Sequence, residues 1–153
     1  MKISVGSDEK TVLTDFVVEE LKRRGHTITL SGPLKGETMG WPEVGEKIGL
    51  EVSGGRADQG IVFCWTGTGV TIAANKVPRV RTALCWDAET AKGARIRDDA
   101  NVLALSLRRT STAVAKRDSG LMIFKQCRYY GIDAELIERA KMLDAKRLHS
   151  TSK

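Results

Sequence analysis

Short β-rich runs and helical patterns alternate along this chain, and this alternation constrains the fold more than any other feature. Strands are predicted where apolar and β-branched residues run together, at 2–6, 26–30, 60–64, 80–85 and 102–106. Helices are predicted between and after these strands, where apolar residues recur at helical spacing, at 12–21, 42–53, 87–97 and 112–126. A further short helix is predicted to end at 75. Such alternation predicts right-handed βαβ crossovers, and therefore an α/β fold: a doubly wound, Rossmann-like, mostly parallel five-stranded sheet with helices on both faces.

The last part of the chain, residues 133–149, has a charged helical pattern with Leu136, Ile137, Ala140 and Leu143 on one side. We expect a C-terminal helix there that caps the domain or packs on a second subunit. At 153 residues the chain is long enough for one core but too short for two substantial ones. A single domain over residues 1–149 with a polar tail at 150–153 is therefore predicted.

Composition narrows the classes of function. The apolar runs are much shorter than the roughly 20 residues of a membrane-spanning helix, and the first residues lack a secretory apolar stretch, so we expect a cytoplasmic protein without membrane contact. Cys64, Cys85 and Cys127 include no C-x-x-C pair, which disfavours a zinc site or a redox dithiol. The net charge of +6 suits an anionic ligand, but basic and acidic residues are interleaved, which disfavours nucleic acid as the partner.

The segment after the third predicted strand, residues 64–76, reads Cys-Trp-Thr-Gly-Thr-Gly-Val-Thr-Ile-Ala-Ala-Asn-Lys. A dinucleotide-binding fingerprint is disfavoured because Ile72 stands where the third glycine belongs, and a cysteine phosphatase loop would lack its arginine. An anion cradle remains, in which glycines expose backbone N–H groups at a helix N-terminus. Such a cradle favours the thiolate form of the adjacent Cys64, which could then act as a base; the alternative is a buried structural cysteine.

Ligands of doubly wound sheets bind outside the carboxyl ends of the strands. Side chains that follow the predicted strands should therefore converge on one edge of the sheet, which we call the rim. These residues are Asp8, 64–69, Trp86, Asp87 and Arg108. An equally simple interpretation of Asp8 is that it caps the helix beginning near Thr11.

The run C-W-T-G-T-G-V-T-I-A-A-N-K resembles the C-G-T-G-x-G-x-x-I-A-A-N-K signature of ribose-5-phosphate isomerase B and its galactose-6-phosphate isomerase relatives. Further matches follow in order: G-S-D at 6–8, A-D-x-G-I at 57–61, V-R-T-A-L-C-x-D at 80–87 and D-A-N-V-L-A-L at 99–105. The similarity spans residues 2–109 and fades from Thr110 onward.

The resemblance implies an aldose–ketose isomerase of carbohydrate metabolism, in the pentose phosphate pathway, which moves a proton between neighbouring carbons of a sugar phosphate through a cis-enediolate without metal or cofactor. Cys64 would be the base, and Asp8 would hold or shuttle protons among the substrate hydroxyls. The Thr66 hydroxyl and the backbone N–H groups nearby would stabilise the charge that develops on oxygen. These N–H groups belong to Gly67, Thr68, Gly69 and Val70.

The same resemblance predicts further substrate contacts and a partner subunit. The candidate contacts are Glu9, Trp86, Arg97, Asn101 and Arg108. Arg108 would bind phosphate or else be solvated, and Asn101 would lie at the rim or else serve only a turn. Family members form dimers that share active-site residues, which implies a homodimer or a dimer of dimers here. Candidates for reaching the partner are Arg128, Arg139 and Lys141.

Departures from the family pattern bear on the substrate. Where the family commonly has histidines that open the sugar ring and grip the phosphate, this chain has Glu9, Trp86 and Arg97-Asp98. Trp65 replaces a glycine beside the predicted base. The hypothesis that follows is a narrower pocket for an open-chain substrate such as a tetrose phosphate, with Arg97 and Arg108 supplying positive charge. The alternative is a catalytically silent sugar-phosphate-binding protein.

Overall fold

Five parallel strands form one sheet in the computed structural model, which describes residues 1–116 and 132–150. The sheet order is β2-β1-β3-β5-β4, so that β3 is the central strand. The strands are β1 (Lys2–Ser7), β2 (Thr27–Ser31), β3 (Gln59–Cys64), β4 (Thr82–Leu84) and β5 (Val102–Ser106). The doubly wound α/β prediction is confirmed, and the sheet is wholly rather than mostly parallel.

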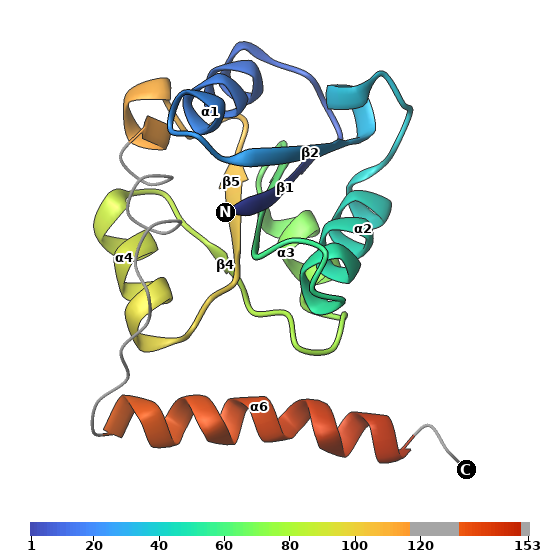
Figure 1. The fold of residues 1–153 in the computed structure, drawn as a ribbon, viewed down its shortest axis with the longest axis vertical. Helices are drawn as coiled ribbons and strands as arrows, with labels where there is room; N and C mark the ends of the chain where they lie inside the picture. The colour runs from blue at the N-terminus through green and yellow to red at the C-terminus, as the bar shows by residue number, and fades with distance from the viewer. Residues whose placement is uncertain (117–131, 151–153) are drawn as a thin grey trace.

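Helices cover both faces of this sheet (Figure 1). They are α1 (Val12–Arg23), α2 (Trp41–Ser53), α3 (Thr68–Ala74), α4 (Ala88–Arg97) and α6 (Ile132–Ser150), with a 3₁₀ turn, η1 (Gly32–Lys35), in the predicted loop after β2. Residues 112–116 are helical, and the rest of the helix predicted at 112–126 lies outside the described residues.

Two apolar clusters, one on each face, hold the layers together. On one face, α1, α4 and residues 112–116 pack on side chains of the three inner strands, including Val5, Phe63 and Leu105. On the other face, α2 and α3 pack on Val62 and Ala104, among others. Because every inner strand is buried on both faces, its residues are apolar without alternation, which explains the continuous apolar runs in the sequence.

Strand β4 is only three residues long, whereas residues 80–85 were predicted to be extended. The shortening has a local cause: the Arg81 N–H donates to Asn101 Oδ1 at 2.8 Å, so it does not take part in strand pairing. The Asn101 amide in turn donates to the Arg79 carbonyl at 2.9 Å. One asparagine side chain thus closes the turn before β4.

Helix α6 lies at the edge of the sheet opposite the rim, below the two helical layers in Figure 1. Lys141 Nζ lies 3.7 Å from Asp99 Oδ2, and Asp144 accepts a hydrogen bond from the Arg79 N–H at 2.8 Å. Since Arg79 and Asp99 precede β4 and β5, these contacts bind α6 to the amino ends of the strands. Among the residues that the structure describes, no helix combines the length and apolarity needed to cross a membrane.

Glu20 in α1 gives the fold a specific acid sensitivity. Its carboxylate is only 7% exposed and accepts hydrogen bonds from Arg23 and Arg24, which lower the pKa of Glu20 from 4.5 to about 2. Because the folded pKa lies below the unfolded one, this stabilisation is complete above pH 4.5 and disappears as the pH falls towards 2. We expect Glu20→Gln to lower the urea concentration at the midpoint of unfolding at pH 7. As the pH falls through that acid window, the midpoint of the variant should decrease less than the midpoint of the parent. Glu19→Gln, on the exposed side of α1, should change neither quantity.

Candidate active site

The carboxyl ends of the three inner strands bring Asp8, Cys64 and Ser106 together at the rim. Ser7 of β1 pairs with Phe63 of β3, so Asp8 follows beside Cys64. Cys64 itself pairs with Ser106 of β5 on its other side. Neighbouring strands are about 4.8 Å apart, and register partners of parallel strands direct their side chains to the same face. A carboxylate, a thiol and a hydroxyl therefore end three adjacent strands.

Cys64 ends the central strand but is largely enclosed by protein. Its side chain is 4% exposed and belongs to the apolar cluster that includes Val44, Ile48 and Val70 of α2 and α3. Its carbonyl accepts hydrogen bonds from the N–H groups of Gly67 and Leu107. The burial fits a structural cysteine, whereas the position at the carboxyl end of the central strand fits a site residue.

The loop after Cys64 has a backbone conformation that depends on glycine. Gly67 has φ of +79° and is the N-cap of α3. The Thr71 N–H makes the first helical hydrogen bond, to the Gly67 carbonyl, so the N–H groups of Gly69 and Val70 precede the helical ladder. The hydroxyls of Thr66 and Thr68 lie 2.7 Å apart. Hydroxyl and amide donors are therefore concentrated within six residues of the predicted base.

Gly67 also lies where a side chain would collide with its neighbours. An added Cβ would lie 2.5 Å from Leu84 Cδ1 and 3.2 Å from the Leu105 carbonyl carbon. We expect Gly67→Ala to lower the free energy of unfolding by about 2–5 kcal/mol, because positive φ costs about 1–2 kcal/mol and overpacking about 1–3. Gly25→Ala is the matched control, since Gly25 has φ of +81° and a Cβ there meets no atom. If urea denaturation shows that Gly67→Ala and Gly25→Ala lose the same free energy of unfolding, the close approach at Gly67 adds no cost.

Asp8 occupies a half-buried position at the end of β1. It does not cap α1: the N-cap is Thr11, whose side chain accepts a hydrogen bond from the Thr14 N–H, so the capping interpretation of Asp8 is wrong. Asp8 Oδ1 is buried and has no hydrogen-bond partner among the described residues. Burial raises the pKa of the Asp8 carboxyl above its usual value, and the nearby charge of Glu9 adds to the shift. A carboxyl in this state is suited to exchanging a proton with a ligand.

A cavity of about 210 Å³ opens beside these residues, and we call it the rim cavity. It lies where the segments following β3, β4 and β5 meet. Its lining residues are Thr66, Leu84, Cys85, Trp86, Ser106, Arg109 and Thr110. Cys64 and Asp8 are not in this lining, but Ser106 is the register partner of Cys64. The cavity therefore lies on the β5 side of the central strand, near its carboxyl end.

The other predicted contacts divide between the two edges of the sheet. Glu9, Trp86 and Arg108 follow β1, β4 and β5 and lie at the rim; the Arg108 N–H donates to the Trp65 carbonyl at 3.2 Å. Arg97 ends α4 at the opposite edge, and Asn101 directly precedes β5 there. Within one chain the expected rim placement of Asn101 is wrong, because a residue that precedes a parallel strand lies at its amino end. The expected contact of Arg97 with the substrate stays a prediction. Asn101 serves the turn before β4, as its alternative interpretation proposed.

Four lining residues of the rim cavity were missed as candidates: Leu84, Ser106, Arg109 and Thr110. Arg109 and Thr110 follow β5 just as Arg108 does, so the rule that placed Arg108 at the rim applies equally to them. Cys85 was expected to be structural, and it is 1% exposed within the apolar core while also lining the cavity. Of the described residues, no three His, Cys, Asp or Glu side chains are grouped so that they could hold a metal ion.

Comparisons with known proteins find similar sequences and a similar fold. Residues 3–133 match the family described as Ribose/Galactose Isomerase. Ribose-5-P isomerase B of Listeria innocua is 35% identical over 106 residues, 69% of this chain and 72% of that protein. D-erythrulose-4-phosphate isomerase of Pectobacterium atrosepticum is 33% identical over 122 residues, 78% and 80% of the two chains. The solved structure of Clostridium thermocellum ribose-5-phosphate isomerase B superposes with a TM-score of 0.88 at 33% identity, covering 96% of this chain and 99% of that one.

Proposed function

The chain belongs to the Ribose/Galactose Isomerase family and is an aldose–ketose isomerase of the ribose-5-phosphate isomerase B type, and from this premise we propose that Cys64 is its base and a tetrose phosphate its substrate. The observation that carries the proposal is the side-by-side arrangement of Asp8, Cys64 and the 66–70 loop at the end of the central strands. In the proposed reaction, the Cys64 thiolate removes the proton α to the carbonyl and returns it to the neighbouring carbon of the cis-enediolate.

The loop supplies the electrostatic part of this mechanism. Proton removal from carbon places negative charge on the adjacent carbonyl oxygen, and donors aimed at that oxygen stabilise it. The Thr66 hydroxyl and the N–H groups of Gly69 and Val70 are such donors. Burial of Cys64 supports the same role, because a largely enclosed base keeps bulk water away from the reacting carbon.

Asp8 is the proposed proton carrier between the substrate oxygens. In a cis-enediolate both oxygens must exchange protons, and a carboxyl placed between them can donate a proton to one and accept a proton from the other. The raised pKa of Asp8 and its unpartnered Oδ1 support this role.

The residues that stand where the family has histidines favour a tetrose phosphate as the substrate. A four-carbon sugar phosphorylated on O4 cannot close a furanose ring, so an enzyme for it needs no ring-opening imidazole. The rim has Glu9 and Trp86 at two of the relevant positions, and His26 lies before β2, at the opposite edge of the sheet. A relative with the name D-erythrulose-4-phosphate isomerase, 33% identical to this chain, supports the same assignment.

The purified chain should therefore isomerise D-erythrulose 4-phosphate with a higher kcat/KM than D-ribose 5-phosphate or a hexose 6-phosphate. Steady-state assays with four-, five- and six-carbon substrates measure this preference. In deuterated water, NMR should show exchange of the proton at the substrate's α carbon, which a silent binding protein cannot produce. Faster turnover of ribose 5-phosphate would refute the assignment of a tetrose phosphate as substrate, but the assignment of isomerase activity would stand.

We also propose that the protein assembles as a homodimer or a dimer of dimers. Trp65 and Trp86 are 61% and 65% exposed at the rim, and Leu136, Met142 and Leu143 are exposed along α6. Apolar side chains of this size are commonly covered in an assembly. Arg139 and Lys141 lie on α6, so they could serve a substrate only at the rim of another copy; Arg128 lies outside the described residues. Sedimentation as a monomer at micromolar concentration would contradict the assembly.

A further inference from the structure

All three tryptophans of the chain border the rim and stay partly exposed. Trp41, Trp65 and Trp86 are 42%, 61% and 65% exposed. Tryptophan is on average a highly buried residue, so exposed indoles that gather at one place are commonly covered by a ligand or a partner. Trp65 directly follows Cys64 in the chain, and the other two indoles contact the loop or the cavity beside it.

Trp86 is a wall of the rim cavity, and its backbone is fixed on both sides. Just before it, the Cys85 N–H donates to the Ala104 carbonyl at 3.1 Å, and just after it, Asp87 caps α4. The indole lines the same cavity of about 210 Å³ as Thr66. The space beside the loop is therefore bounded by an aromatic ring whose backbone is held in place.

Trp41 contacts the same loop at Gly69, where the absence of a side chain makes room for the indole. A Cβ added to Gly69 would lie 2.9, 3.1 and 3.3 Å from Cδ2, Cε3 and Cε2 of Trp41. Gly69 lies within α3 and does not have a positive φ, so alanine could adopt its backbone conformation and would favour the helix more than glycine does. The close approach of the Trp41 ring therefore explains the glycine at this position.

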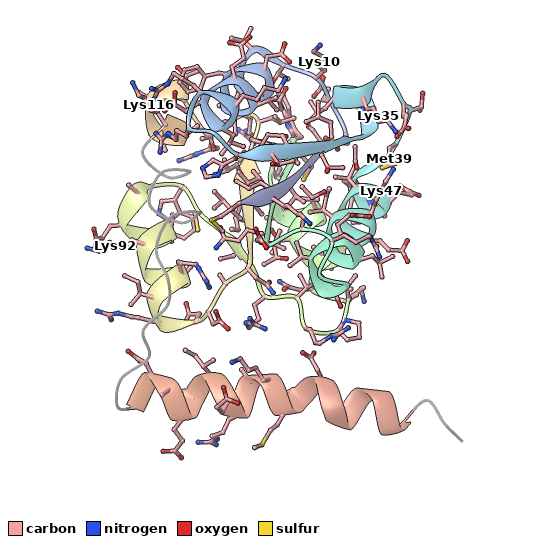
Figure 2. The ribbon with its side chains drawn as sticks, in the orientation of Figure 1. Lys10, Lys35, Met39, Lys47, Lys92 and Lys116 are labelled. Carbon is pink, nitrogen blue, oxygen red and sulfur yellow. The ribbon has the colours of Figure 1, made fainter. Side chains whose placement is uncertain are left out.

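The two indoles come from opposite sides of the sheet. Trp41 begins α2, whereas Trp86 directly precedes α4. These helices pack in two separate apolar clusters and lie on opposite sides of the molecule, as Lys47 of α2 and Lys92 of α4 show in Figure 2. The loop that follows Cys64 therefore lies between two aromatic side chains.

We propose that Trp41 and Trp86 form an aromatic wall that limits the length of the sugar phosphate reacting at Cys64, and that they are specificity-determining residues of the isomerase. This inference rests on the proposed function, because the carbon chain of the substrate must extend from the base into the rim cavity. Each additional CHOH group needs at least the volume of one water molecule, about 30 Å³, and the indole of Trp86 bounds the space available. Trp41 covers the loop on its other side, so a longer chain cannot extend over it. The wall thus selects by excluding the longer sugar.

A graded series at Trp86 tests the limit on length. The measured quantity is the ratio of kcat/KM for D-erythrulose 4-phosphate to kcat/KM for D-ribose 5-phosphate. It should fall roughly 10- to 100-fold in Trp86→Ala and by a smaller factor in Trp86→Phe, whose ring is smaller than indole. The Tm should stay unchanged, because the side chain is largely exposed. Leu50→Ala is the matched control: Leu50 is 48% exposed on α2, about 13 Å along the helix axis from Trp41, and its loss should leave the ratio unchanged.

The contact with Gly69 tests the part played by Trp41. Trp41→Ala should lower the same ratio about 3- to 10-fold, and Trp41→Phe should keep most of it. Gly69→Ala collides with the indole, so it should lower the Tm of the parent and lower it less in a Trp41→Ala background. Such coupling assigns the effect to this contact rather than to a general loss of stability.

Intrinsic fluorescence tests the aromatic wall by binding alone. Because all three tryptophans of the chain border the rim, D-erythrulose 4-phosphate should shift the emission of the parent to shorter wavelength, and Trp86→Phe should lose part of this shift. The absence of a shift in the parent would overturn the inference. An unchanged substrate ratio in Trp86→Ala would overturn it as well, and a changed sedimentation of that variant would then assign the indole to a subunit interface.

The substrate assays separate this inference from the proposed function. If the parent prefers the tetrose phosphate and Trp86→Ala keeps that preference, the aromatic wall fails and the proposed function stands. If the parent prefers ribose 5-phosphate, the assignment of a tetrose phosphate fails. The aromatic wall then stands if Trp86→Ala shifts the preference towards a hexose 6-phosphate, and fails if it does not.

Discussion

Cys64→Ala should lower kcat for isomerisation about 10²- to 10⁴-fold, the range expected when a general base is removed. Cys64→Ser should lose nearly as much, although its side chain fills almost the same space, because a hydroxyl ionises far less readily than a thiol. The measurement is kcat at saturating substrate together with the rate of α-proton exchange in deuterated water. If Cys64 is the base, both rates fall together.

Damage to the core must be separated from loss of the base, because Cys64 is only 4% exposed. Val62→Ala is the matched control: Val62 lies two residues earlier on the same face of β3, is fully buried and is not near the proposed chemistry. It should lower the Tm at least as much as Cys64→Ala and keep kcat within about threefold, since the cavity left is larger. A Cys64→Ala enzyme within tenfold of the parent would show that the thiol is structural and that another group takes the proton.

The location of the rim could be predicted from the sequence because it follows from local patterns. Each strand and helix is specified by the spacing of its own apolar residues, and parallel strands place all their carboxyl ends at one edge. Asp8, Cys64 and Arg108 were found by this rule, and Arg109 and Thr110 follow from it as well. Their roles cannot be predicted in the same way, because the rim cavity forms only where three separate segments meet.

Two errors in the prediction involve Asn101 and have different origins. The strand predicted at 80–85 is shorter because the side chain of Asn101 takes the Arg81 N–H that would otherwise pair. Asn101 itself was expected at the rim because its motif resembles that of the family, although it precedes the strand at 102–106. Periodicity describes the apolar face of an element but not the side-chain hydrogen bonds at its ends. The direction of the chain along a strand, in contrast, is known from the sequence. It places Asn101 at the amino end of the strand, and it is stronger evidence for that placement than the motif.

Asp8→Asn should reduce kcat about 10²- to 10³-fold while raising the thermal stability of the protein at pH 7. The asparagine keeps the size of the side chain but cannot exchange a proton between substrate oxygens. The gain in stability has a separate cause: burial raises the pKa of Asp8, so its carboxylate form is disfavoured by the fold. Removing a charge that the folded state holds at a cost stabilises that state.

The pH dependence of this gain tests the cause. A raised folded pKa means that the favourable contribution of protonated Asp8 is complete below the usual value of 3.8 and is lost as the pH rises through the folded pKa. The Tm of Asp8→Asn should therefore exceed that of the parent at pH 7, and the difference should vanish as the pH approaches 3.8. Asp87→Asn is the opposite control, because the Thr90 N–H lowers the pKa of Asp87 and its loss should reduce the Tm at pH 7. If Asp8→Asn is less stable than the parent at pH 7, the carboxylate of Asp8 has a stabilising partner in the folded protein. The proposed role of Asp8 as a proton carrier would then lose its electrostatic basis.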